Sequence, residues 1–483
     1  MDDSNLFLML ERHRDVDREY ISDKAECLSY RQTLQAVERI GHVAEVEGIG
    51  QQHVALIAEN SVQYVCAYWM LLKRQCVVVP VSAAASDEEA LSQIRYTDCT
   101  WIVAHGSHLE LGLRLASALS LGLLYIAEGR AQVMARPTRR YGLRAASGTA
   151  VMIYTSGSTS QPKRVMLSHS ALVQNVMMHN TVAELSHADR TILCLPIEFG
   201  YAQGTQLLNA TLVGASVHLR RDRHFDPNAF LKLCRNIEPT FLTVVPSLLR
   251  LLEMALQPKD ERVGSLRKIF FGGSPSHPNT LRSWRTKAPH IALMNTYGMT
   301  ECGPRISTAR PDDTDDHSLG YPLPGVRVRS VSAESGVQDG EIEVSTPSMM
   351  LGYYQQPGET AASFSRDGWF RTGDLGYVAA DGRLLLTGRV KNVVIVGGMN
   401  VSCEEIEAAA LATQDIAEAR SCGIFDEGDE YLSLDVVLAS GADLDVEDVR
   451  RHLRQRLSAH KVPLSINIVK SIQKTANGKI RRF

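Results

Sequence analysis

Apolar residues in the first third of the chain follow two alternating periods, one typical of helices and one typical of strands. Spacings of three and four residues predict helices over Tyr30–Val46, Val62–Leu72 and Glu88–Ile94. Short apolar runs between them predict buried strands at Val54–Ile57, Val77–Val79 and Trp101–Val103. We expect Pro80 to end the second strand, because proline has no backbone N–H to donate.

The same alternation continues along the chain and predicts the fold class. Further apolar runs with strand character lie at Ser216–Leu219, Thr240–Val245 and Lys268–Phe271. The apolar stretch Leu113–Ala127 contains Arg114 and is too short to span a bilayer, so it predicts a buried helix or a helix–strand pair. Strands that alternate with helices indicate an α/β fold with layered, largely parallel sheets.

The pattern changes near Gly376–Gly382, which is rich in turn residues. A compact block follows, with helical patterns at Glu404–Leu411 and Val446–Leu457 and strand patterns at Tyr431–Leu438 and Ser465–Val469. This block predicts a small α+β C-terminal domain after a large multilayer N-terminal domain. We place the boundary so that the domains are residues 1–388 and 389–483.

Composition supports a globular protein with at least two domains. The 483 residues are 44% hydrophobic and 22% charged, and the formal net charge of −3 gives no electrostatic case for binding nucleic acid or an anionic membrane. The nine cysteines form no close pair and the first residues are acidic, which favours reduced thiols in a cytoplasmic protein. The fifteen histidines show no metal-ligand spacing.

The segment Tyr154–Lys163 gathers hydroxyls, a glycine and a lysine directly after an apolar run. Hydroxyls and free backbone N–H groups in a tight loop can hold phosphate oxygens, and a lysine adds positive charge. The residues expected to do so are Thr155, Ser156, Gly157, Ser158, Thr159 and Lys163. The spacing is not that of a Walker loop, and a Ser/Thr/Gly run taken alone is more often a flexible loop.

Four further segments accompany this loop in a fixed order: Asn295–Glu301, Arg371–Asp374, Gly388–Lys391 and Lys474–Lys479. Together the five motifs resemble those of the adenylate-forming (AMP-binding) superfamily, which includes acyl-CoA synthetases, peptide-synthetase adenylation domains and luciferase. The resemblance covers nearly the whole chain. It implies a large N-terminal domain, a mobile C-terminal lid domain, and an ATP- and Mg²⁺-dependent reaction that releases AMP and pyrophosphate.

The resemblance also implies roles for residues of the nucleotide site. Glu301 is expected to supply the carboxylate for Mg²⁺, Thr300 to contact the α-phosphate, and Asp374 to accept hydrogen bonds from the ribose hydroxyls. The other expected contacts are Tyr297 and Gly298 near adenine, Arg389 near ribose or phosphate, and the turn Gly272, Gly273 and Ser274. Thr300 and Glu301 are also ordinary residues at a helix start, and Asp374 is an ordinary turn residue.

The C-terminal motifs imply a moving lysine. Lys479 occupies the family's catalytic position, where an ammonium can bridge the attacking carboxylate and the α-phosphate. Lys391 matches the hinge, and rotation there would present Gly397 and Gly398 to a thiol.

Four residues depart from the family pattern. Ser160 and Arg164 stand where glycine is usual, Asn392 where aspartate is usual, and Cys403 where proline is usual. The changes at Ser160 and Arg164 leave the hydroxyl donors in place, whereas those at Asn392 and Cys403 make the second half-reaction less secure than the first.

The segment Leu195–Tyr201 resembles the border of the acyl pocket. Enzymes that activate α-amino acids usually carry an aspartate after the aromatic residue, but here Gly200 follows Phe199. A buried ammonium without a partner is costly, so we expect an acid with no α-ammonium, either aryl, heteroaryl or short acyl. Glu198 could replace the aspartate only if it turns inward. The expected pocket residues, which could equally be core residues, are Phe199, Tyr201, Ser274, Cys302 and Pro304.

The acceptor is open at this stage. Four residues follow Lys479 and no phosphopantetheine attachment motif is visible, so we expect a free-standing enzyme. The acyl group would pass to coenzyme A, to a separate phosphopantetheinyl carrier protein, or to an amine. The alternatives are a stand-alone amino-acid adenylating enzyme or amide-bond synthetase, and a non-catalytic nucleotide-binding protein. The sequence does not give the oligomeric state.

Overall fold

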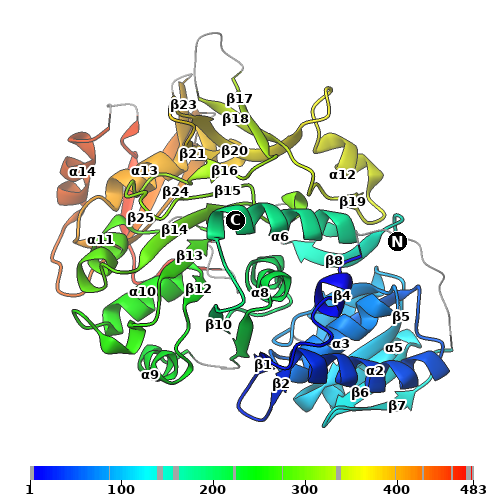
Figure 1. Ribbon diagram of the computed structural model, residues 1–483. Helices are drawn as coiled ribbons and strands as arrows, with labels where there is room; N and C mark the ends of the chain where they lie inside the picture. The colour runs from blue at the N-terminus through cyan, green and yellow to red at the C-terminus, as the bar shows by residue number, and fades with distance from the viewer. Residues whose placement is uncertain are drawn as a thin grey trace.

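The computed structural model describes residues 5–85, 87–138, 145–155, 163–220, 225–274, 276–332, 339–396, 399–426, 429–457, 461–474 and 480. Its described strands form an eight-stranded and a nine-stranded sheet together with three smaller sheets (Figure 1). No helix in these ranges is both long and apolar enough to cross a membrane.

The eight-stranded sheet is built mainly from the N-terminal part of the chain. In spatial order its strands are β19 (Gly352–Tyr353), β9 (Lys163–Ser168), β8 (Thr149–Thr155), β4 (Val77–Val81), β3 (His53–Ile57), β5 (Cys99–His105), β6 (Gly122–Ala127) and β7 (Arg130–Ala135). The helices that pack around it are α2 (Tyr30–Val46), α3 (Val62–Lys73), α4 (Asp87–Arg95) and α5 (Leu109–Leu119). The five central strands β8, β4, β3, β5 and β6 are parallel.

The nine-stranded sheet carries most of the candidate site. In spatial order its strands are β16 (Tyr321–Pro322), β15 (Ser307–Thr308), β14 (Ala292–Tyr297), β13 (Lys268–Gly272), β12 (Phe241–Val244), β10 (Arg190–Leu193), β11 (Ser216–Leu219), β1 (Glu19–Ser22) and β2 (Cys27–Ser29). The associated helices are α1 (Leu8–Glu11), α6 (His169–Ala183), α7 (Gly200–Ala202), the π-helical turn η2 (Gln203–Leu208), α8 (Asn209–Val213), α9 (Pro227–Ile237), α10 (Pro246–Ala255) and α11 (Pro278–Lys287).

One apolar core joins the two large sheets. It contains Val54 of β3, Val217 of β11 and every residue of α3 from Tyr64 to Leu72. Because α3 is buried on all sides, its sequence is apolar all round rather than amphipathic. A separate core lies under α9, α10 and α11.

The remaining elements form the upper part of the molecule as it is shown in Figure 1. An antiparallel sheet consists of β17 (Arg327–Val331), β18 (Gly340–Ser345), β20 (Phe370–Val378) and β21 (Leu384–Arg389), and α12 (Pro357–Ala362) lies between β19 and β20 in the chain. The C-terminal elements are β22 (Val393–Val396), β23 (Met399–Ser402), α13 (Cys403–Ala410), β24 (Ile416–Asp426), β25 (Asp429–Leu438), α14 (Val446–Arg454) and β26 (Ser465–Ile468). They have their own apolar core.

The predicted α/β class, with large N-terminal sheets and a small C-terminal sheet domain, is confirmed. Pro80 was wrongly expected to end a strand. The strand β4 continues to Val81 because it pairs with β3 through Pro80, whereas its recorded pairing with β8 is at Val78. The boundary between 388 and 389, at the end of β21, stays a prediction.

The turn-rich stretch is shorter than predicted. Gly376 lies inside β20, where a Cβ atom would stand 2.1 Å from the carbonyl oxygen of Leu385. Glycine is required there by the close approach of β21, and the turn itself follows Val378.

Candidate active site

Two predicted site residues, Tyr297 and Arg389, contact the buried carboxylate of a third, Asp374, and each of the three comes from a different motif. Tyr297 ends β14, and its hydroxyl donates a 2.6 Å hydrogen bond to Oδ2 of Asp374. Arg389, opposite Asp374 across the β20–β21 pair, places its Nε 2.8 Å from Oδ1. Asp374 is only 3% exposed, and burial together with this carboxylate raises the pKa of Tyr297 well above its usual range. Each carboxylate oxygen keeps one lone-pair direction for a further donor.

Tyr353 contacts both Glu301, the predicted metal ligand, and Lys163, the lysine predicted to bind phosphate. Glu301 lies in the short helix η4 (Thr300–Cys302), and its Oε1 accepts a 2.9 Å hydrogen bond from the hydroxyl of Tyr353. The ammonium of Lys163 lies 4.5 Å from the centre of the Tyr353 ring. Burial and the neighbouring Glu301 raise the pKa of Tyr353. The sequence motifs did not include Tyr353, which sits in β19 beside β9.

The predicted phosphate loop joins two antiparallel strands. Thr155 at the end of β8 pairs with Lys163 at the start of β9, and Ser156, Gly157, Ser158 and Thr159 between them lie outside the described residues. Lys163 forms a 2.8 Å ion pair with Glu359 of α12. The expectation of a phosphate cradle here therefore remains a prediction.

The side chain of Arg164 contacts Tyr154 and Tyr96. Its Nε donates a 2.8 Å hydrogen bond to the Tyr154 hydroxyl, and its guanidinium stacks 5.2 Å from the centre of the Tyr96 ring. The side chain is 9% exposed. The extra charge that replaces glycine in the motif is thus used in packing the loop base against α4.

Two glycines allow backbone segments to approach each other at the ends of β13 and β14. A Cβ atom on Gly272 would lie 2.2 Å from the carbonyl oxygen of Thr296, and one on Gly298 would lie 2.0 Å from that of Pro304. Gly273 has a φ of +90°, which favours glycine, and Ser274 follows it on the surface.

The predicted acyl residues Phe199 and Tyr201 belong to the start of α7, which adjoins Thr300 and the end of β14. The position of a Cβ on Gly200 is 4.0 Å from Oγ1 of Thr300, and Phe199 precedes it as the residue before α7. The hydroxyl of Tyr201 lies 2.9 Å from Oγ1 of Thr296, and burial raises the pKa of Tyr201 to about 12. Tyr201 is therefore fixed at the end of β14, close to the predicted catalytic Thr300.

Two other predicted acyl residues, Pro304 and Cys302, do not share the environment of Tyr201. Pro304 packs against η2, since a Cβ atom on Gly204 would meet its ring at 3.0 Å. The side chain of Cys302 is fully buried in the core between the large sheets, and burial raises the pKa of its thiol. Its carbonyl accepts a 2.7 Å hydrogen bond from Ser348.

Glu198 does not turn toward Tyr201. Its carboxylate accepts hydrogen bonds from the Ser82 side chain and the Ala83 backbone, in the segment after β4. Burial raises the pKa of this carboxyl above its ordinary value.

Arg305, which follows the Glu301 motif, is a buried charge that sequence analysis did not single out. It is 1% exposed, and its three guanidinium nitrogens have no hydrogen-bond partner in the described structure. Burial lowers its pKa to about 9. The available signal was a single charge inside the otherwise uncharged run Cys302–Ile306, directly after the Glu301 motif.

The predicted hinge residue Lys391 lies between β21 and the C-terminal elements. The backbone of Lys391 lies in the turn η5 (Val390–Asn392), while its side chain, Gly397, Gly398 and Lys479 lie outside the described residues. Asn392 donates a hydrogen bond to Glu404. Cys403 is the first residue of α13, a position that proline commonly occupies. Cysteine in place of the family's proline leaves the helix start intact, with Ser402 as its N-cap.

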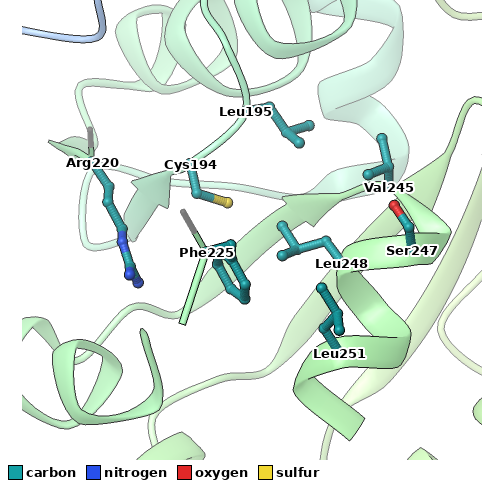
Figure 2. Close-up of a pocket in the computed structure, with 8 residues that line it drawn as sticks. All are labelled: Cys194, Leu195, Arg220, Phe225, Val245, Ser247, Leu248 and Leu251. Carbon is teal, nitrogen blue, oxygen red and sulfur yellow. The ribbon is translucent and has the colours of Figure 1, made fainter. Parts of the chain in front are cut away.

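A cavity of about 250 Å³ lies near the ends of β10 and β12 (Figure 2). Its lining is Cys194, Leu195, Arg220, Phe225, Val245, Ser247, Leu248 and Leu251. None of the predicted site residues is among them.

The Glu301 carboxylate suits one particular mode of metal binding. Among the described residues, no group of three or more His, Cys, Asp or Glu side chains is placed to hold a metal ion. Mg²⁺ commonly takes one or two carboxylates and completes its shell with phosphate oxygens and water. A single partly shielded carboxylate, with Oε1 oriented by Tyr353, fits that pattern.

Comparisons with known proteins identify the family of the chain. The profile of the AMP-binding enzyme family matches residues 11–354, and that of the AMP-binding enzyme C-terminal domain matches residues 405–479. The probable CoA ligase CCL9 of Humulus lupulus is 26% identical over 475 residues, which cover 94% of this chain and 90% of that protein.

Two solved structures are similar over almost the full chain. ATP-bound MatB from Rhodopseudomonas palustris is 27% identical with a TM-score of 0.88, covering 99% of this chain and 97% of that one. The amide bond synthetase McbA from Marinactinospora thermotolerans is 26% identical with a TM-score of 0.85, covering 98% of each chain.

Fold, site and similarity together define an adenylate-forming enzyme, and the chain belongs to the AMP-binding enzyme family. Within that family it is of the AMP-forming acid–thiol ligase type, which binds ATP.

Proposed function

We propose that the protein activates a carboxylic acid without an α-ammonium group and then transfers the acyl group to a thiol. The observation that carries this proposal is the convergence of Tyr297, Asp374 and Arg389 near the segment that holds Thr300 and Glu301. This arrangement offers a ribose acceptor on one side and groups for the reacting phosphate on the other.

In the first half-reaction, a carboxylate oxygen of the acid attacks the α-phosphorus of ATP. One C–O–P bond forms, and the bond from the α-phosphorus to pyrophosphate breaks. Asp374 accepts hydrogen bonds from the ribose hydroxyls and fixes the distance to Thr300. Glu301 would hold Mg²⁺, which when bound supplies positive charge against the phosphate oxygens. Lys479 stabilises the charge that develops between the two anionic reactants.

The acid is expected to lack an α-ammonium because, among the described residues of the segment Leu195–Tyr201, no free carboxylate is placed to pair with that cation. Gly200 has no side chain, and Glu198 is hydrogen-bonded to Ser82 and Ala83 in another segment. An unpaired buried ammonium would cost several kcal/mol, on the order of the penalty for other buried ions.

We propose coenzyme A as the acceptor, with a separate phosphopantetheinyl carrier protein as the alternative. The support is the similarity to a probable CoA ligase over most of both chains. In this second half-reaction the thiolate attacks the acyl carbon, a thioester forms, and AMP leaves. The second candidate is amide formation, favoured by the similarity to McbA, in which an amine takes the place of the thiol.

The test is direct detection of acyl-AMP by mass spectrometry with a panel of carboxylic and amino acids. Lys479→Ala should lower acyl-AMP formation by about 100-fold or more while ATP binding by calorimetry is retained. Lys474→Ala, which removes an exposed lysine paired with Glu418 at 2.7 Å, is the matched control and should change little.

The same assay separates the candidates. Adding coenzyme A should convert acyl-AMP to a thioester, whereas an amide synthetase would need an amine. Activation of α-amino acids in preference to other acids would overturn the pocket argument.

A further inference from the structure

Arg305 carries a buried positive charge for which the described residues provide no counter-charge. The side chain is 1% exposed, and Nε, Nη1 and Nη2 have no hydrogen-bond partner there. Most buried arginines in proteins pair with a carboxylate or donate to carbonyl groups. Such an unpaired group calls for an explanation from function.

The fold holds the backbone of Arg305 firmly, so the side chain cannot leave by a shift of this segment. Asn175 of α6 donates 2.9 Å and 3.2 Å hydrogen bonds to the carbonyls of Arg305 and Cys302, and accepts one of 3.3 Å from the N–H of Arg305. The bare backbone of Gly298 lies against the Cα of Arg305, where a Cβ would stand at 2.8 Å.

Arg305 is connected to the expected acyl segment through Pro304, which contacts Gly204 of η2, directly after α7. Its charge acts on the Tyr201 phenol, and Tyr201 follows Gly200, which adjoins Thr300. Thr300 belongs to the motif expected at the α-phosphate. Because Gly200 adjoins Thr300 and Arg305 interacts with the neighbouring Tyr201, we expect the reacting end of an acid at Thr300 and its deeper end at Arg305.

The neighbouring turn η2 adds polar atoms to this deeper end. Gly204 of η2 touches Pro304, the residue before Arg305. The buried atoms of η2 that lack a hydrogen-bond partner in the described structure are Nε2 and Oε1 of Gln203, Oγ1 of Thr205 and Oε1 of Gln206. A π-helical turn of this kind often marks a functional site. Burial lowers the pKa of His179 of α6 well below its usual value, and the positive charge of Arg305 lowers it further.

The energetic cost of this arrangement is large. An unpaired buried charge costs several kcal/mol, and the penalty falls when an anion with matching geometry approaches. The planar guanidinium fork matches a carboxylate with two parallel N–H···O bonds. Although burial lowers the pKa of Arg305 to about 9, the group remains cationic at neutral pH.

We propose that Arg305 binds a second carboxylate at the far end of the acid, so that the protein activates dicarboxylic acids. This inference rests on the proposed function and narrows its substrate class. The first carboxylate forms the C–O–P bond to AMP, while the second stays ionised and unreacted against Arg305. A cation in this position also disfavours an α-ammonium group.

The test measures acid-dependent exchange of labelled pyrophosphate into ATP with acids matched in carbon skeleton. The pairs are butyrate with succinate, valerate with glutarate, and benzoate with isophthalate and terephthalate. For at least one pair, the wild type should prefer the dicarboxylate by about 100-fold or more in kcat/KM. Arg305→Met should remove that preference and raise kcat/KM for the matched monocarboxylate, while Arg305→Lys should retain part of it.

Two controls separate recognition from folding. Arg329→Met removes an arginine of β17 that pairs with Glu343 and Asp367, and it should leave the acid preference unchanged. Thermal unfolding of Arg305→Met should show no loss of Tm, because the variant removes an unpaired buried charge. AMP binding by calorimetry reports on the nucleotide site in each variant.

The outcomes are distinguishable. Preference of the wild type for monocarboxylates, or equal preferences in the wild type and Arg305→Met, would overturn the dicarboxylate inference and leave acid activation in place. Exchange with none of the acids, despite nucleotide binding, would overturn acid activation itself and this inference with it.

Discussion

At the residue scale, the proposed nucleotide site centres on the carboxylate of Asp374. Both of its oxygens are already oriented, one by the Tyr297 hydroxyl and one by Arg389. Because each oxygen has two lone-pair directions, the same carboxylate can accept two hydroxyl hydrogen bonds without moving. A ribose diol is a ligand with that pair of donors.

Asp374→Asn should weaken AMP binding by about ten- to a hundredfold, or about 1.5–3 kcal/mol. The amide nitrogen would face either the Tyr297 hydroxyl or Arg389, both of which now donate to the carboxylate. Calorimetry with AMP measures the change. Asp381→Asn, in an exposed turn paired with Arg383, is the control. Equal affinity in Asp374→Asn and the wild type would remove Asp374 from the site.

The sequence predicts the residues that make up motifs better than those that contact them from elsewhere. Tyr297, Asp374 and Arg389 come from three motifs and meet as expected. Tyr353 and Arg305 were missed, because the pairing of β19 with β9 and the burial of a lone arginine depend on long-range contacts that no local pattern records.

At the element scale, the candidate site depends on close contact between the two ends of the segment that joins β14 to β15. The turn at Gly298 lies so near Pro304 and Arg305 that the two ends leave no room for a side chain. This close packing sets Tyr297 on one side and the acyl segment on the other.

Gly298→Ala should destabilise the protein by about 3 kcal/mol or more, because the added Cβ would lie 2.0 Å from the Pro304 carbonyl oxygen. Gly358→Ala, where no atom lies within 4 Å of the added Cβ, should stay within about 0.5 kcal/mol of the wild type. Thermal unfolding and AMP binding are the measurements. A normal Tm for Gly298→Ala would contradict the geometry of this contact.

The start of α6 gives the protein a defined sensitivity to acid. His169, its first residue, accepts a 3.2 Å hydrogen bond at Nδ1 from the Leu6 N–H, and burial lowers its pKa to about 4. Because the folded pKa lies below the unfolded value of about 6.5, stability is fully present above that value and is lost as pH falls toward 4.

Relative to His169→Gln, the wild type should lose about 1.4 kcal/mol per pH unit between pH 6.5 and 4. Denaturant unfolding at several pH values gives the difference, and the other histidines cancel because both proteins contain them. His317→Gln, at an exposed loop position, is the control. Parallel stability profiles for the wild type and His169→Gln would contradict a buried neutral imidazole.

The periodicity of apolar residues predicted where helices and strands occur, but it often did not predict the residues at which they end. The helix Tyr30–Val46 was predicted with its observed bounds, and its start is fixed by a capping box between Ser29 and Gln32. Pro80 and Gly376 were assigned as breaks, but pairing with β3 and close packing on β21 keep both inside strands. A proline or glycine can be recognised from the sequence as an exception to the strand pattern. Whether it ends the strand depends on how the neighbouring strand pairs with it.

At the scale of the whole molecule, a few polar contacts join β21 to the C-terminal elements. Ser402 donates a 2.9 Å hydrogen bond to the Thr387 carbonyl, and Asn392 donates to Glu404. The missing side chain of Gly388 lets Ser402 approach, since a Cβ would stand 2.1 Å from its Oγ. The predicted hinge rotation would require these contacts to be exchanged.

Asn392→Asp should loosen this contact, because it replaces a donor with a carboxylate beside the carboxylate of Glu404. Hydrogen exchange should become faster in the backbone of α13 and β23, while Asn392→Ser should show a smaller change. The rates of the two half-reactions should shift relative to each other with the KM for the acid unchanged. Identical exchange in Asn392→Asp and the wild type would remove this contact from the hinge.

The central claim is that residues of the N-terminal domain and Lys479 act together on one acid and one ATP. Acid-dependent exchange of labelled pyrophosphate into ATP tests it most directly, because the exchange requires acyl-AMP to form reversibly. The account predicts exchange that needs both Mg²⁺ and a carboxylic acid, proceeds without coenzyme A, and is abolished in Lys479→Ala. Nucleotide binding without exchange for any acid would contradict it and leave a protein that only binds nucleotide.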